Sequence, residues 1–151
     1  MKGVLRRLLH FQNPNAQAKL VSVLQGEVFD VAVDIRVGSP SFGEWVGVTL
    51  SAENKRQLYV PEGFAYGFLV TSEAALFSYM FSHKRADYYN SEAEHSVLRN
   101  DPGLGLDWPL ESSVLSGKDR SGAHLAEIPP EKLLKHEVIA LKMSGQKAEM
   151  K

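Results

Sequence analysis

Phe29-Asp30-Val31-Ala32-Val33-Asp34-Ile35 is the stretch that decides the fold class of this chain. Its odd-numbered positions are all apolar, and two of the three positions between them are aspartates. A period of two places alternate side chains on opposite faces of a β-strand, whereas a helix would repeat every 3.6 residues. The stretch therefore predicts a strand with one apolar face and one mostly polar face.

The same alternation returns further along the chain, in residues Val46 to Leu50 and Ala75 to Phe81. Turn-forming residues separate the runs at Gly38-Ser39-Pro40, Ser51-Ala52-Glu53-Asn54 and Pro61-Glu62-Gly63. Short strands at this spacing are typical of a sandwich, jelly roll or barrel, and not of alternating strands and helices. Helix is expected only late in the sequence, beginning near Pro129.

Length and composition narrow the function classes. The 151 residues suffice for one domain with a full hydrophobic core, and 44% apolar with 23% charged residues is ordinary for a globular protein. A formal net charge of −1 favours neither nucleic acid nor an anionic membrane as a partner. Cysteine is absent, which excludes disulfides and a Cys nucleophile and fits a reducing cytoplasm. No apolar stretch has the length of a membrane span or a signal peptide.

His10 and Lys19, near the start of the chain, have the chemistry for proton transfer beside a carbonyl. His10 offers an imidazole, and Arg7 precedes it by three residues; a lone histidine is nevertheless more often structural. Lys19 shares strand parity with Val21 and Val23, so it is expected to project inward, where a cation needs a partner or a task. The alternative for Lys19 is an edge-strand charge that discourages aggregation.

Later candidates are also open to two interpretations. Tyr79 shares a strand face with Phe77 and Phe81, so it is either an acid or a core aromatic with its hydroxyl at the rim. Asp119 lies in a loop-like stretch and is either an orienting carboxylate or part of a solvated turn. Tyr89, beside Tyr88, either stacks on a base or is a strand aromatic.

Metal and cofactor chemistry are not indicated. The five histidines form no His-x-His pair, and no carboxylate follows them at ligand spacing. The sequence contains no Gly-rich phosphate loop and no nucleophile elbow. We therefore expect neither a metal nor an organic cofactor.

A dense set of motifs sharpens this interpretation. It comprises Lys19-Leu20-Val21, Gly26 to Asp34, Ser39-Pro40, Phe42-Gly43, Leu50 to Leu58, Gly63 to Phe68, Asn100-Asp101-Pro102 and Asp107-Trp108-Pro109. With these motifs the chain resembles the dTDP-4-dehydrorhamnose 3,5-epimerase family from about residue 3 to residue 128. The resemblance implies a mainly β, jelly-roll or cupin-like double-stranded β-barrel with short C-terminal helices. We expect the domain to span residues 1–128 and a helical or disordered tail to span 129–151.

The resemblance also implies an activity: metal-independent epimerisation of dTDP-4-dehydro-6-deoxy-D-glucose at C3 and C5, giving dTDP-4-dehydro-L-rhamnose. It implies that His10 is the base, that Asp119 orients it, that Tyr79 is the acid on the opposite face and that Lys19 stabilises the enolate. The implied substrate contacts are Arg7 with the diphosphate, Tyr89 with thymine, and Glu94, Lys118 and Tyr66. Members of the family are homodimers that exchange strands.

Four departures from the family pattern are visible. Leu8 stands where the family has a glycine, and it shares strand parity with His10, which predicts crowding of the site. Tyr66 replaces a histidine, so a neutral phenol would face the enolate oxygen. The stretch from Ser82 to Ala86 is longer than usual, and a further N-terminal segment of the family is expected to be absent. The alternatives are therefore an impaired or single-carbon epimerase, or a non-enzymatic jelly-roll binding module.

Overall fold

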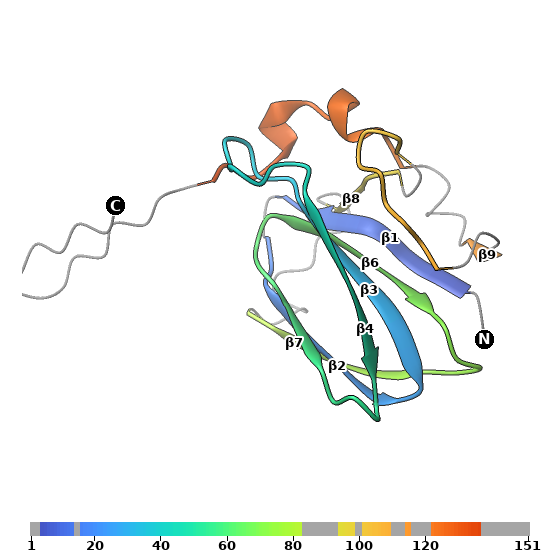
Figure 1. Ribbon diagram of the computed structural model, residues 1–151. Helices are drawn as coiled ribbons and strands as arrows, with labels where there is room; N and C mark the ends of the chain where they lie inside the picture. The colour runs from blue at the N-terminus through green and yellow to red at the C-terminus, as the bar shows by residue number, and fades with distance from the viewer. Residues whose placement is uncertain are drawn as a thin grey trace, which may run out of the picture.

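The computed structural model describes residues 4–13, 16–82, 94–98, 101–109, 114–115 and 122–136, with side chains placed at all of these except 4–8, 94 and 114–115. Two β-sheets dominate it (Figure 1). Within these residues, no helix is long and apolar enough to cross a membrane.

The larger sheet follows the order β4-β3-β6-β1-β8, and β9 also pairs with β1. Its strands are β1 (Val4–Gln12), β3 (Glu27–Asp34), β4 (Trp45–Ser51), β6 (Phe64–Val70), β8 (Glu94–Ser96) and β9 (Val114–Leu115). All of these pairs are antiparallel except that of β1 with β9.

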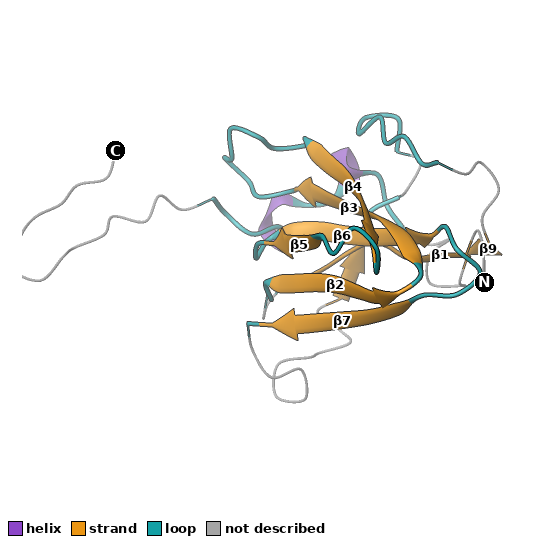
Figure 2. Cartoon of the chain, turned by 60° about the horizontal axis from the view of Figure 1, so that its bottom comes forward, coloured by secondary structure: helices purple, strands orange, loops and turns teal. Residues whose placement is uncertain are grey.

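The smaller sheet has the order β5-β2-β7 and is antiparallel throughout. It consists of β2 (Lys19–Gln25), β5 (Gln57–Val60) and β7 (Leu76–Phe81). The two sheets lie face to face as separate layers (Figure 2). The predicted mainly β, jelly-roll architecture is confirmed, in the form of a two-layered sandwich.

Strand β3 is central because both of its faces are buried. Val31 and Val33 point away from the smaller sheet and are 1% and 0% exposed. Val28 and Ala32 point toward the smaller sheet and join the core between the layers. The strand predicted from alternation is therefore confirmed, and its mostly polar face lies in the interior of the sandwich.

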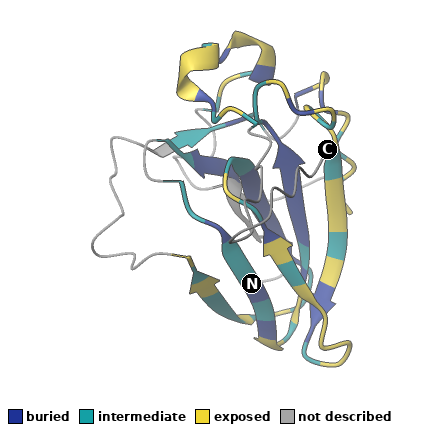
Figure 3. Ribbon diagram, turned by 90° about the vertical axis from the view of Figure 1, so that its left-hand side faces the viewer, coloured by how far each residue is buried: buried dark blue, intermediate teal, exposed yellow. Residues whose placement is uncertain are grey.

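The C-terminal part of the chain covers the outer face of the larger sheet. Two short 3-10 helices, η3 (Leu125–Glu127) and η4 (Pro130–Lys132), lie there, and the strands beneath them are mostly buried (Figure 3). Leu133 packs into the outer core, and the backbone N–H of His136 donates to the carbonyl of Val37. Packing thus continues past residue 128, and the expected boundary between domain and tail stays a prediction.

A glycine is required at the turn between β2 and β3. Gly26 has a φ of +82°, and a Cβ there would overlap the carbonyl oxygen of Ala74. Only glycine adopts this conformation without steric cost. The tight turn places β2 and β3 in opposite sheets, so that their inward side chains face each other across the sandwich.

Candidate active site

Five polar side chains from five strands meet on the inward faces of the two sheets. They are His10 on β1, Lys19 on β2, Asp30 on β3, Tyr66 on β6 and Tyr79 on β7. Four of them were predicted as site residues from the sequence, and Asp30 was not. The surrounding core is apolar, so each interaction within the cluster acts in a medium of low polarity.

His10 reaches the interior through an irregularity in β1. It lies opposite Tyr66 in the antiparallel ladder, so the two side chains share a face, and it is only 8% exposed. The register shifts between Arg6 and His10, and Leu9 within this bulge has a φ of +26°. Positive φ is costly for leucine, and strain of this kind is common where a strand re-aims a functional side chain. The bulge also means that parity with His10 does not fix the direction of Leu8, whose side chain lies outside the described part.

Lys19 projects inward as its parity with Val21 and Val23 predicts. Those valines are 0% and 6% exposed. The Lys19 Nζ lies 5.0 Å from the centroid of the Tyr66 ring. A cation over an aromatic face is stabilised by the ring quadrupole, so the interior position gives Lys19 an aromatic partner.

Tyr79 packs as a core aromatic, and its role as an acid stays a prediction. Its ring stacks between Phe77 and Phe81 with centroid distances of 5.6 and 6.1 Å. It also lies edge-to-face against Tyr66, with centroids 6.4 Å apart and planes at 82°. Burial raises the pKa of Tyr66, and the nearby Tyr79 adds to this rise. Tyr79 is therefore a core aromatic whose hydroxyl belongs to the polar cluster.

Asp30 is the site residue that the sequence pattern did not single out. The Tyr66 hydroxyl donates to its Oδ2 over 3.0 Å, and the two residues are 0% and 1% exposed. Among the described residues, none donates a hydrogen bond to the other oxygen, Oδ1. Burial raises the pKa of Asp30 to about 7, and the hydrogen bond from Tyr66 offsets only part of the rise.

The partner of Asp30 is also perturbed. Burial and the neighbouring Asp30 raise the pKa of Tyr66 well above the usual value of 10.0. The phenol therefore stays protonated at neutral pH. Tyr66 has a single O–H and donates it to Asp30 when that carboxyl is ionised. The expected hydrogen bond from Tyr66 to an enolate oxygen therefore competes with the hydrogen bond to Asp30.

Asp34 shows what a satisfied carboxylate on the same strand looks like. Arg36 donates to both of its oxygens at 2.9 Å, and the hydroxyls of Ser39 and Ser41 donate to Oδ2 at 2.5 and 2.6 Å. Although burial works in the opposite direction, these hydrogen bonds hold the pKa of Asp34 well below its usual range. Two inward-facing aspartates four residues apart thus have pKa values shifted in opposite directions, because only one is paired with a cation.

The contrast predicts a pH dependence of stability. A raised pKa in the folded state means that Asp30 keeps a proton which the unfolded chain has already lost, so folding becomes less favourable as pH rises toward 7. We expect the Asp30 contribution to the free energy of unfolding to fall by about 3 kcal/mol between pH 5 and pH 8. Urea denaturation of the parent and of Asp30→Asn at both pH values measures it. Asp107→Asn, at an exposed position, is the matched control. The same change in the free energy of unfolding between pH 5 and pH 8 in all three proteins would contradict the prediction.

The remaining predicted site residues are placed only in part. Arg7 lies on β1 and Glu94 on β8, but their side chains are outside the described part. Tyr89, Lys118 and Asp119 lie wholly outside it, as does the long stretch that follows Ser82. Their roles stay predictions.

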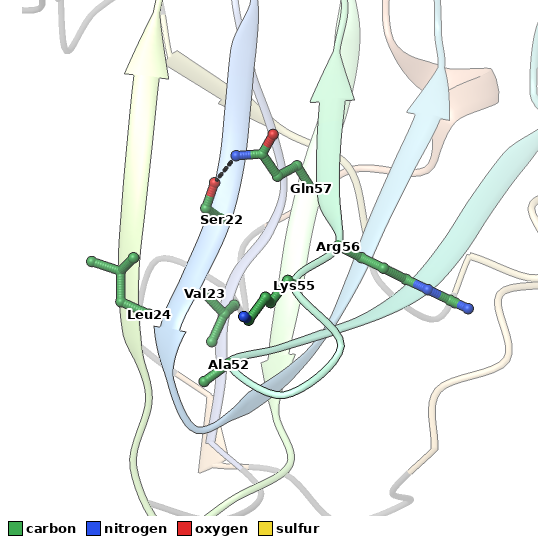
Figure 4. Close-up of a pocket in the computed structure, with 7 residues that line it drawn as sticks. All are labelled: Ser22, Val23, Leu24, Ala52, Lys55, Arg56 and Gln57. Atoms are coloured by element: carbon green, nitrogen blue, oxygen red, sulfur yellow. Dashed lines mark hydrogen bonds between the residues drawn. The ribbon is translucent and has the colours of Figure 1, made fainter.

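Two other kinds of site were searched for. In the part of the chain that is placed, no three His, Cys, Asp or Glu residues gather as metal ligands do. A surface pocket of about 310 Å³ lies beside the end of β2 remote from Lys19, and Figure 4 shows the Gln57–Ser22 hydrogen bond of 2.7 Å at its wall and Arg56 directed away from it. None of the five cluster residues lines this pocket.

Comparison with known proteins finds one family. The profile of the family described as dTDP-4-dehydrorhamnose 3,5-epimerase matches residues 1–127. Relatives with that description from Neisseria gonorrhoeae and Pseudomonas aeruginosa are each 54% identical over 127 residues, which is 83% of this chain. The match covers 37% of the first relative and 67% of the second, so the chain spans only about a third of the Neisseria protein.

A solved structure shows the same fold. The dTDP-6-deoxy-D-glucose-3,5-epimerase from Legionella pneumophila, in complex with dTDP-4-keto-L-rhamnose, superimposes with a TM-score of 0.84 at 54% identity. The match covers 91% of this chain and 71% of the Legionella chain.

Proposed function

Because this chain belongs to the dTDP-4-dehydrorhamnose 3,5-epimerase family, we propose that it epimerises dTDP-4-dehydro-6-deoxy-D-glucose at C3 and C5. The product would be dTDP-4-dehydro-L-rhamnose, and the class of enzyme an isomerase of dTDP-L-rhamnose biosynthesis. The observation that carries the proposal is the inward-facing cluster of an imidazole, an ammonium and a phenol on facing sheets. The reaction needs a base, an oxyanion stabiliser and an acid, and these three groups supply them.

The first step in the proposed mechanism is removal of a proton next to the C4 carbonyl. His10 takes the proton, because imidazole is a base that works near neutral pH. The electrons of the broken C–H bond move onto the carbonyl oxygen and give an enolate. Lys19, held among aromatic side chains in the interior, stabilises that oxygen by preorganised positive charge. Asp119 is proposed to orient His10, as carboxylates do in hydrolase triads.

Inversion then requires a proton on the opposite face of the ring. Tyr79 is proposed as the donor, because its hydroxyl lies in the cluster and comes from the sheet opposite that of His10. Arg7, Tyr89, Glu94 and Lys118 are proposed to hold the nucleotide and sugar. No metal or organic cofactor enters this mechanism.

The proposed activity has a direct test. The protein is incubated with dTDP-4-keto-6-deoxyglucose in deuterated water, and deuterium at C3 and C5 and the epimerised product are followed by NMR. We expect exchange and product at both carbons. Exchange at one carbon would favour a single-carbon epimerase, and dTDP binding without any exchange would favour a non-enzymatic module. The single-carbon or slow alternative has its own support, since the Tyr66 hydroxyl is engaged by Asp30.

Tyr79→Phe separates the acid from the base. Loss of the phenolic hydroxyl is expected to reduce product formation about 100-fold. Exchange on the His10 face should change less than threefold, because proton removal does not need Tyr79. The stacked ring is retained, so thermal stability should match the parent. Equal losses of product and exchange would show that Tyr79 only shapes the site.

A homodimer in the cytoplasm is part of the proposal. Tyr59, Leu20 and Met80 stand in one row across the outer face of the smaller sheet, and Tyr59 and Met80 are 63% and 65% exposed. An apolar row of this kind is a suitable surface for a second copy. The cytoplasm suits a fold that needs no disulfide. Light scattering after size-exclusion chromatography tests the dimer.

A further inference from the structure

The ring of Tyr66 is held in place by contacts on several sides. Its hydroxyl donates to Oδ2 of Asp30 over 3.0 Å. The ring of Tyr79 lies edge-to-face against it with centroids 6.4 Å apart, and the ring of Phe68 is tilted against it at 6.3 Å. Tyr66 is only 1% exposed, and interior side chains are closely packed. The ring therefore presents a fixed aromatic face to the inside of the sandwich.

The Lys19 side chain reaches this face from the opposite layer. Lys19 begins β2 in the smaller sheet, whereas Tyr66 lies on β6 in the larger one (Figure 2). The Lys19 Nζ lies 5.0 Å from the centroid of the Tyr66 ring. Lysine has a long and flexible side chain, so holding its ammonium at one point costs conformational entropy. Attraction to an aromatic face offsets this cost, and it is strongest where water is excluded.

We propose that Tyr66 is a positioning residue whose ring holds the Lys19 ammonium at the point where the enolate oxygen forms. The inference rests on the proposed function, because it assumes that Lys19 stabilises an enolate. It assigns the role to the aromatic ring of Tyr66. The hydroxyl, which donates to Asp30, anchors that ring. Tyr66 acts through Lys19 and does not contact the reacting atoms.

Preorganisation is the reason why such a ring affects the rate. An oxyanion is stabilised most by a charge that is already in place, because a charge that must first move loses part of its effect in reorganisation. A neutral ring attracts an ammonium without cancelling its positive charge, as a carboxylate partner would. The charge held over the ring is therefore still available to the enolate oxygen.

Two substitutions at position 66 separate the ring from the hydroxyl. Tyr66→Phe keeps the ring beneath Lys19 and removes the O–H, whereas Tyr66→Leu removes the ring and keeps an apolar side chain. The measured rate is washout of the C3 and C5 hydrogens in deuterated water, followed by NMR. We expect its kcat to fall less than threefold in Tyr66→Phe and about 10- to 30-fold in Tyr66→Leu. The dissociation constant for dTDP should stay within threefold in both, because Lys19 is proposed to act at the sugar.

A graded substitution tests the electrostatic attraction while the shape of the ring is kept. Phenylalanine carrying one, two or three fluorine atoms is incorporated at position 66. Each fluorine withdraws electron density from the ring face and so weakens its attraction for a cation. Relative to Tyr66→Phe, we expect kcat to fall with each added fluorine, to a total loss of about tenfold.

The same fluorinated series at Phe68 is the matched control. The Phe68 ring is buried and contacts the ring of Tyr66. The two cation–π contacts in the described part of the chain involve other rings. Fluorine at Phe68 should therefore leave kcat within twofold of the parent, and urea denaturation verifies that every variant is folded.

An NMR measurement reports the contact without any catalysis. Protons above an aromatic ring are shifted upfield by its ring current. The ε-methylene protons of Lys19 should show this shift in the parent and in Tyr66→Phe, and lose it in Tyr66→Leu. Those of Lys55, which is exposed, should show no such change in any variant.

The outcomes distinguish the inference from the function on which it rests. If the parent gives no washout, the proposed function fails and the catalytic role of the ring fails with it. If the parent is active and the fluorinated series keeps the rate of Tyr66→Phe, the ring does not position Lys19 and the proposed function stands. A loss in Tyr66→Phe as large as that in Tyr66→Leu would assign the role to the hydroxyl and would also overturn the inference. If Tyr66→Leu does not fold, the fluorinated series decides alone.

Discussion

Replacing His10 with alanine is expected to reduce washout of the C3 and C5 hydrogens by about 10³- to 10⁴-fold. The effect is large because a positioned base contributes up to about 10⁴-fold, and the other four members of the described cluster, a lysine, two tyrosines and Asp30, include no imidazole. Product should fall by at least as much, since both carbons depend on the same proton removal. The measurement is deuterium incorporation at both carbons, followed by NMR.

His95→Ala is the matched control for this change. His95 lies opposite Phe11 on the neighbouring strand, and its ring contacts Phe11 at a centroid distance of 5.2 Å, so it faces the outer core. Loss of this imidazole should leave the washout rate within threefold of the parent. Washout at the parent rate in a folded His10→Ala variant would assign the base to another residue.

Lys19→Met has the second largest expected effect. Methionine keeps an apolar chain of similar length in the core and removes the charge, so the stabilisation of the enolate oxygen is lost. One preorganised donor at such an oxygen contributes about 3 kcal/mol, which corresponds to a loss of about 10²- to 10³-fold in kcat. The dissociation constant for dTDP should stay within threefold, because Lys19 is proposed to act at the sugar and not at the nucleotide.

The control for Lys19 lies at the other end of the same sheet. Lys55 is exposed in the turn before β5 and lines the surface pocket. Lys55→Met removes the same charge from the protein and should leave kcat unchanged. A Lys19→Met variant that retains more than half of the parent kcat would contradict the assigned role. Weakened dTDP binding would indicate that Lys19 contacts the nucleotide.

Much of the fold was predictable from local pattern. The alternation of residues 29–35 predicted β3, and the runs ending at Leu50 and Phe81 predicted β4 and β7. The reason is physical: with a period of two, each residue's neighbours on its own strand already define its face. Parity alone also directed Lys19 and Tyr79 into the interior, where they lie.

Other features depend on contacts between distant residues. The bulge that directs the His10 side chain inward comes from the pairing of β1 with β6, and the local alternation of apolar and polar residues does not predict it. The extent of packing beyond residue 128 depends likewise on a bridge between Val37 and Lys135. Such contacts join parts of the chain separated by tens of residues, so no short window of sequence contains them.

The sequence by itself determined that this chain is a β sandwich of one family and which residue types could move a proton. Only the tertiary structure showed that Asp30 lies in the cluster and that its pKa is shifted in the direction opposite to that of Asp34. On a strand the two aspartates are equivalent, both facing inward with even numbering. They diverge because Arg36 and two serines reach Asp34, whereas Asp30 meets a buried phenol and an oxygen without a donor among the described residues. The partners of Asp34 come from the turn that follows it in the chain, whereas the partner of Asp30 comes from β6, a strand more than thirty residues away. The ionisation of a buried carboxyl depends on the groups beside it, and for Asp30 only the folded chain provides them.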